Sequence, residues 1–272
     1  MDFFELFKYQ FIIRAIYTGI FVAGTCSLLG IFLVLRRLSL IGDGLAHITF
    51  GGVAIGILTK HEPFYIAMPI SVLSSLGILK LSQKAKIYGD AAIGIVSAVG
   101  IAFGVIISNI AGGFNIDLFS YLFGNILAIS KTDMYISLIL SLIVCGIIIK
   151  NFDDFFSIAF DEELAQVTGI NTKKLNYLLS ILTAVTVVMS MRVVGIMLVS
   201  ALLILPAASA LQIFHSFKKV AFFSVFFSVL SVLTGILISL FFNLPSGATI
   251  VFVNFIIFLF CLFLKHLESA RR

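Results

Sequence analysis

Nine stretches of about 20 almost entirely apolar residues constrain the fold of this chain more than any other feature. A helix of about 20 apolar residues crosses the ~30 Å hydrocarbon core of a bilayer, and its backbone groups bond to one another in the absence of water. The sequence therefore predicts an all-α, polytopic transmembrane bundle of about nine spans, with a range of eight to ten, that forms one domain over residues 1–272. The predicted spans cover residues 11–35, 38–58, 64–81, 91–111, 133–149, 175–191, 193–213, 220–241 and 248–265.

The composition excludes the common alternatives. Of the 272 residues, 61% are hydrophobic and only 11% are charged. Soluble domains are about 45–50% apolar and about 25% charged, and disordered chains are richer still in charge. The net charge of +5 comes from scattered basic pairs such as Arg36-Arg37 rather than from one basic patch. Membrane lipid is therefore the expected environment, and no nucleic-acid partner is expected.

The distribution of basic residues predicts the orientation, because loops rich in Lys and Arg stay in the cytoplasm. Residues 112–117 and 242–248 contain no Lys or Arg and are predicted to lie outside. The N-terminus is then outside and the C-terminus is cytoplasmic. The polar segment 114–130 is predicted to be a short surface or re-entrant helix, although a tenth span remains an alternative. Predicted cytoplasmic loops contain residues 36–37, 80–86, 150–174, 218–219 and 265–272.

One pair of polar residues lies within a predicted span. Asp43 and His47 are four residues apart, so both side chains project from one face of a helix. A carboxylate and an imidazole in this arrangement can bind one divalent transition ion, and ionisable groups inside a membrane are typically functional. With the span starting at residue 38, His47 would lie about 13 Å from its inner end. The alternative is an Asp–His hydrogen bond that fixes two helices without an ion.

Other intramembrane residues indicate helix packing. Gly52 and Gly56 have the G-x-x-x-G spacing that allows close helix approach. Pro206 is predicted to break or kink a helix near the middle of its span. Four polar residues in spans are expected to form hydrogen bonds between helices: Ser200, Gln212, Ser239 and Asn254.

The segment 150–174 is the longest predicted cytoplasmic loop. Asp161 can cap a short helix whose first turn carries Glu162 and Glu163, because acidic residues favour the N-terminal end of a helix. Apolar residues follow at roughly helical spacing, and Gly169 can end the helix. A short amphipathic helix at the inner surface is therefore predicted, and a solvated linker is the alternative.

The missing motifs also narrow the function. The chain has no G-x-x-x-x-G-K-[ST] phosphate-binding loop, no H-E-x-x-H and no G-x-S-x-G. An acid–base enzyme built on Asp43 and His47 would need a third converging group, and none is evident. The chain is thus expected to be a transport subunit that takes its energy from a partner or from a gradient. A secondary metal transporter coupled to an ion gradient is the alternative function.

Four ordered segments resemble the ABC-3 family of bacterial ABC importer permeases for zinc, manganese or iron. They are LRRLSLIGDGLAHITFGGVAIG (35–56), YLFGNILAIS (121–130), FDEELAQVTGI (160–170) and MRVVGIMLVSALLILPAASA (191–210). The resemblance runs in register over nearly the whole chain.

This resemblance implies a role for each segment. Asp43 and His47 match a G-D-x-x-x-H motif on the metal path, and the segment 191–210 matches the translocation core. The residues implied to dock onto the ATPase are Phe160, Asp161, Glu162, Glu163, Leu164, Val167 and Gly169.

The resemblance also implies partners and a location. The partners are two ABC ATPase subunits, a second copy of the permease in a homodimer and an extracytoplasmic metal-binding protein. The implied location is the bacterial cytoplasmic membrane. No cofactor is expected to be permanently bound, and Zn²⁺ is favoured as the transported ion over Mn²⁺ or Fe²⁺. The preference rests on the sequence ITFGG after His47, which lacks the proline associated with the manganese branch.

Overall fold

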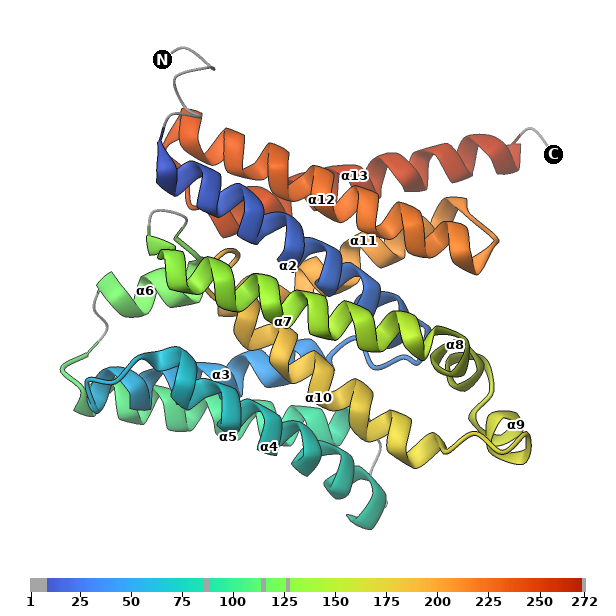
Figure 1. The fold of residues 1–272 in the computed structure, drawn as a ribbon, viewed down its shortest axis with the longest axis horizontal. Helices are drawn as coiled ribbons and strands as arrows, with labels where there is room; N and C mark the ends of the chain where they lie inside the picture. The colour runs from blue at the N-terminus through green and yellow to red at the C-terminus, as the bar shows by residue number, and fades with distance from the viewer. Residues whose placement is uncertain (1–8, 86–88, 114–115, 126–127, 271–272) are drawn as a thin grey trace.

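The computed structural model describes residues 9–270 except 86–88, 114–115 and 126–127. The described residues contain twelve α-helices and no β-strand, and the long helices run side by side in one bundle (Figure 1). The predicted all-α bundle is confirmed.

Eight helical segments in the described part of the chain are long and apolar enough to cross a membrane. They are α2 (Gln10–Leu35), α3 (Ile41–Leu58), α4 (Pro63–Ala85), α5 (Gly89–Ile110), α7 (Lys131–Lys150), the short 3₁₀ helix η2 (Ile196–Leu198) together with α11 (Val199–Ile213), α12 (Phe217–Phe242) and α13 (Ser246–Ala270).

The remaining predicted span corresponds to α10 (Thr172–Ser190). Lys173 and Lys174 in its first turn reduce its mean hydropathy, but α10 packs against α2, α3, α4 and α7 inside the bundle (Figure 1). Its position agrees with the predicted span 175–191, and the eight candidate spans of the described residues lie within the predicted range of eight to ten.

The segment 114–130 does not form a tenth span. Its described part contains α6 (Ile116–Phe123), which has 8 residues and is therefore only about 12 Å long. The helix ends at Gly124, whose φ of 76° is in the left-handed region. Asn115, one of the polar residues behind the prediction, lies outside the described residues. A short helix was the prediction here, and it is confirmed.

The link between α10 and α11, residues 191–198, is irregular and tightly enclosed. The Arg192 carbonyl accepts a hydrogen bond from the Asn125 backbone N–H at 3.2 Å, and the Val193 carbonyl accepts one from Ser246 Oγ at 3.3 Å. Gly195 has a φ of 89°, and a Cβ placed on it would lie 2.4 Å from the Gly124 nitrogen. The segment is therefore held between the end of α6 and the start of α13.

Pro206 lies within α11, and its side chain is buried. The helix continues on both sides of the proline, so the irregular backbone in this part of the bundle is the 191–198 link rather than a break at Pro206.

The two ends of the bundle differ. One end carries α8 (Phe152–Phe160), α9 (Glu162–Val167) and the C-terminus of the chain, and we call it the α9 end (Figure 1). The opposite end carries α6 and the start of α2, and we call it the α6 end. The prediction of a single helix in the segment 150–174 was incomplete, because α8 precedes α9. Phe152 and Phe155 of α8 pack against Phe32 of α2, with ring centroids 5.7 and 5.5 Å apart.

Candidate functional site

Asp43 and His47 lie on one face of α3, near the α9 end. The distance from His47 Nε2 to Asp43 Oδ2 is 3.4 Å. The side chain of His47 is 16% exposed, and that of Asp43 is 46% exposed. The Nδ1 atom of His47 is buried and has no hydrogen-bond partner among the described residues. The pair is therefore close enough to share one cation, and the imidazole retains an unused nitrogen.

The helix that carries the pair begins three residues later than predicted. The helix begins at Ile41 rather than at residue 38, so His47 lies about 9 Å from its start. Asp43 is in the first turn. The pair thus lies in the half of α3 that is nearest the α9 end, and almost half of the Asp43 side chain is exposed.

Glycines bring neighbouring helices close to this part of α3. A Cβ on Gly42 would lie 2.7 Å from Leu203 Cδ1 of α11, and one on Gly44 would lie 2.8 Å from Ile93 Cγ2 of α5. Further along α3, a Cβ on Gly52 would lie 2.7 Å from the Cα atom of Ala67, and a Cβ on Gly56 would lie 2.6 Å from the Cα atom of Pro63. Small residues therefore let α4, α5 and α11 pack around the helix that carries Asp43 and His47.

Of the four polar residues expected to form hydrogen bonds between helices, only some do so. Ser231 donates a hydrogen bond to Asn254 at 2.8 Å, and Lys265 donates one to Gln212 at 2.8 Å. Ser239 instead donates to the carbonyl of Leu244 in the turn after its own helix. Ser200 Oγ, which lies 3.6 Å from the position of a Cβ on Gly42, is buried without a partner in the described structure. The interhelical prediction is therefore confirmed for two of the four.

No third ligand joins the pair among the residues that the structure describes. Within the described residues, no group of three or more His, Cys, Asp and Glu side chains could hold a metal ion. Asp43 and His47 provide one oxygen and one nitrogen donor, which is a donor set that Zn²⁺ and Mn²⁺ both accept. A site with so few ligands fits an ion that is bound and then released rather than one that is held permanently.

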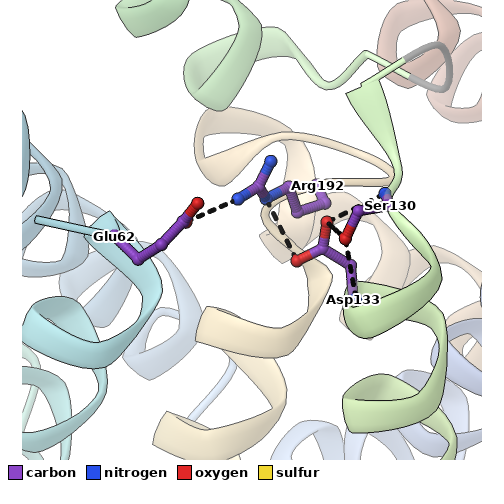
Figure 2. Close-up of polar contacts among 4 residues, drawn as sticks. All are labelled: Glu62, Ser130, Asp133 and Arg192. Atoms are coloured by element: carbon purple, nitrogen blue, oxygen red, sulfur yellow. Dashed lines mark hydrogen bonds and ion pairs between the residues drawn. The ribbon is translucent and has the colours of Figure 1, made fainter.

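A network of charged residues connects three segments at the α6 end (Figure 2). Arg192 donates a hydrogen bond from Nη2 to Glu62 at 2.9 Å, and its Nε lies 3.6 Å from Asp133 Oδ1. Asp133 and Ser130 form a reciprocal capping box at the start of α7. The network joins the α3–α4 turn and the N-terminus of α7 to the 191–198 link. Glu62 and Asp133 are far from Arg192 in sequence, so no local pattern indicated this contact.

A cavity of about 420 Å³ lies beside this network, between α3 and α6. Its lining includes Lys60, His61, Tyr121, Asn125 and Arg192. The guanidinium carbon of Arg192 lies 5.0 Å from the ring centre of Tyr121, at cation–π distance. Helix α3 therefore borders a polar cavity with its C-terminal end and carries the Asp43–His47 pair at its N-terminal end.

Helix α9 has the predicted cap and the predicted end. Asp161 Oδ1 accepts a hydrogen bond from the Leu164 backbone N–H at 2.9 Å. Gly169, with a φ of 91°, follows the last turn. The apolar residues of this segment are open to the surroundings: Phe160 is 68% exposed, Leu164 61% and Val167 84%. The predicted amphipathic helix is confirmed, and its exposed apolar side chains form a surface at the α9 end.

The described residues thus form an all-helical bundle in which eight helical segments are long and apolar enough to cross a membrane, which is the architecture of a polytopic membrane protein. The model of the ABC 3 transport family matches residues 8–265. The chain therefore belongs to the ABC 3 transport family, as its sequence motifs predicted, and it is a membrane transport subunit rather than an enzyme.

Relatives and a solved structure match over most of their lengths. The manganese transport system membrane protein MntC of Listeria monocytogenes is 36% identical over 253 residues, which cover 93% of this chain and 90% of the relative. The high-affinity zinc uptake system membrane protein ZnuB of Haemophilus influenzae is 31% identical, with coverages of 94% and 98%. The structure of PsaBC from Streptococcus pneumoniae in complex with Fab matches with a TM-score of 0.87, 32% identity, and coverages of 98% and 97%.

Proposed function

We propose that this chain is the permease subunit of an ABC importer that moves a divalent transition metal into the cytoplasm, driven by ATP hydrolysis on a separate subunit. The observation that carries the proposal is the Asp43–His47 pair on α3, whose buried His47 Nδ1 has no partner among the described residues. Membership of a transport family supports a role for this pair in conducting an ion.

The ion is proposed to be Zn²⁺ or Mn²⁺. One imidazole and one carboxylate are acceptable to both ions. The relatives support both, because MntC is named for manganese transport and ZnuB for zinc uptake. Zn²⁺ remains the first candidate from the sequence, and uptake of both ions has to be measured side by side.

The proposed assembly is a homodimer of this permease with two ATPase subunits and an extracytoplasmic metal-binding protein, in the bacterial cytoplasmic membrane. The exposed apolar surface formed by Phe160, Leu164 and Val167 supports docking of the ATPase at the α9 end. The polar cavity beside Arg192 at the α6 end is then the side from which the ion arrives.

The ion site is tested by Asp43→Asn and His47→Ala in cells that lack their own uptake of the two metals. Loss of one ligand-like group typically lowers metal binding or activity about 10–100-fold, so each variant should reduce ⁶⁵Zn or ⁵⁴Mn uptake at least about tenfold. His266→Ala, at an exposed histidine of α13, is the matched control and should retain normal uptake. Normal uptake by well-expressed Asp43→Asn or His47→Ala would show that the pair is not the ion site. Uptake that survives removal of the ATPase but stops with a protonophore would favour the gradient-coupled alternative.

The orientation is tested by labelling single cysteines in a background in which Cys26, Cys145 and Cys261 are replaced. Membrane-impermeant maleimide should label Lys60→Cys and Asn243→Cys, both exposed at the α6 end, in intact cells. Lys173→Cys and Ser216→Cys, exposed at the α9 end, should react only after the cells are opened. Labelling of Lys173→Cys in intact cells would place α9 outside and rule out its docking to a cytoplasmic ATPase.

A further inference from the structure

Three side chains from three segments form a closed set of hydrogen bonds at the α9 end. Arg36, directly after α2, donates from Nη2 to Oε2 of Glu162, the first residue of α9, at 2.7 Å. Arg36 also donates from Nη1 to Oδ1 of Asn176 in α10. Asn176 Nδ2 donates to the second oxygen of Glu162 at 2.7 Å. Each of the three side chains thus contacts the other two, and we call them the Arg36 triad.

The arginine of the triad is largely enclosed. Its side chain is only 13% exposed, whereas that of Glu162 is 44% exposed. Burial lowers the pKa of Arg36 from its ordinary value, and the adjacent Glu162 carboxylate partly reverses this change. A guanidinium remains charged under these conditions, and its hydrogen bond to a carboxylate is short and strong. The contact between α9 and the end of α2 is therefore directional and is better protected from solvent than an ordinary surface ion pair.

The turn from Arg36 to α3 is short and is closed by several backbone hydrogen bonds. The backbone N–H of Leu38 bonds to the carbonyl of Leu33 at 2.8 Å, and that of Arg37 bonds to Val34 at 3.1 Å. Arg37 has a φ of 57°, so the turn has the geometry of a Schellman motif. Ile41, the first residue of α3, then bonds back to Leu38 at 3.0 Å. A displacement of Arg36 is consequently passed to the first turn of α3, which contains Asp43.

The helix before α9 is attached to the same end of α2. Phe32 contacts Phe152 and Phe155 of α8, and it lies one helical turn before Arg36. The aromatic contact and the Arg36 triad therefore attach α8 and α9 to one short part of α2.

We propose that Arg36 is a positioning residue that transmits displacement of the docking helix α9 to α3 and so sets the position of Asp43. This inference rests on the proposed function, because it takes α9 as the ATPase-docking helix and Asp43 as part of the ion site. It adds the physical connection between them. Glu162 of α9 forms an ion pair with Arg36, and the hydrogen-bonded turn after Arg36 leads into α3.

The test measures coupling in proteoliposomes that contain this permease with the ATPase and binding protein of its own genome. Arg36→Gln removes the charge but keeps a polar side chain. The number of ATP molecules hydrolysed per Zn²⁺ or Mn²⁺ taken up should rise about threefold to tenfold, a range that fits the coupling energies of single positions. The ATPase should still co-purify, because the apolar surface of α9 is unchanged.

Two further variants separate transmission from a merely structural role. Exchange of the charges in Arg36→Glu/Glu162→Arg should bring the ratio back toward the normal value, because Asn176 can reverse its amide to serve both new partners. Arg37→Gln removes the neighbouring exposed charge, which has no ion pair within the described residues, and should leave the ratio unchanged.

The proposal is overturned if Arg36→Gln lowers hydrolysis and uptake in equal proportion, or if Arg37→Gln raises the ratio as much as Arg36→Gln does. These results are distinguishable from failure of the ion site. If Asp43→Asn transports normally while Arg36→Gln still raises the ratio, the ion-site assignment fails but α9 remains coupled to α3. If the unaltered complex takes up neither metal, the proposed function fails, and this inference fails with it.

Discussion

Ala165→Pro is expected to abolish coupled metal uptake. The backbone N–H of Ala165 bonds to the carbonyl of Asp161 at 3.0 Å, and the side chain is 2% exposed. Proline removes this bond and its ring collides with the preceding turn, at a cost of about 3 kcal/mol in a helix interior. A helix of only 6 residues cannot absorb such a cost and will unfold. The exposed side chains of Leu164 and Val167 then lose their common face.

The measurement is co-purification of the ATPase together with ATP hydrolysis and metal uptake in proteoliposomes. Ala165→Pro should either lose the ATPase or hydrolyse ATP without transport. Ala165→Ser is the control, because it keeps the backbone N–H and nearly the same volume, and it should retain coupled uptake. Normal coupling in the proline variant would refute the docking role of α9.

Gly195→Ala is expected to destabilise the bundle strongly. The φ of 89° at Gly195 disfavours any L-residue by about 1–3 kcal/mol. The new methyl group would also lie 2.4 Å from the backbone atoms of Leu122, Phe123 and Gly124, which have no freedom to withdraw. Overpacking of this kind typically costs a further ~1–3 kcal/mol. The two costs together, about 2–6 kcal/mol, are a large fraction of the ~5–15 kcal/mol by which native proteins are typically stable.

The measurement is the yield of monodisperse protein in mild detergent and its midpoint of thermal unfolding. Two alanine controls separate the cost of the positive φ from the cost of the steric overlap. Gly146→Ala, inside α7 with open space around it, should be neutral or slightly stabilising. Gly112→Ala has a φ of 102° but no neighbouring atoms within 4 Å, so it carries only the backbone cost. A Gly195→Ala protein as stable as Gly112→Ala would show that the 191–198 link can yield.

The sequence could predict what depends on neighbouring residues in the chain. Asp43 and His47 lie on one face because they are four residues apart, and Asp161 caps α9 because the next residues are helical. The start of the helix that carries His47 was placed three residues too early for a physical reason. Leu38 and the residue after it are apolar or small, but their backbone forms the turn between α2 and α3, so the apolar run is longer than the helix.

Contacts between distant segments could not be predicted in the same way. Arg36 and Glu162 are 126 residues apart, and Arg192 and Glu62 are 130 apart. Neither pair has a local signal, because each exists only once the bundle has brought its segments together. The helix α8 was missed for a related reason: its helical conformation is stabilised by packing on Phe32, which is far away in the sequence. The missing information was therefore the contacts between helices, together with the short helix α8, which packs on one of them.

The enclosed 191–198 link also has a consequence for how the chain is made. Its Val193 carbonyl is bonded by Ser246 and its Arg192 carbonyl by the Asn125 backbone N–H. Ser246 follows Val193 by 53 residues in the chain, so the hydrogen bond between the start of α13 and the link can form only after α13 has begun to be synthesised. A chain truncated before residue 246 therefore lacks the donor to the Val193 carbonyl.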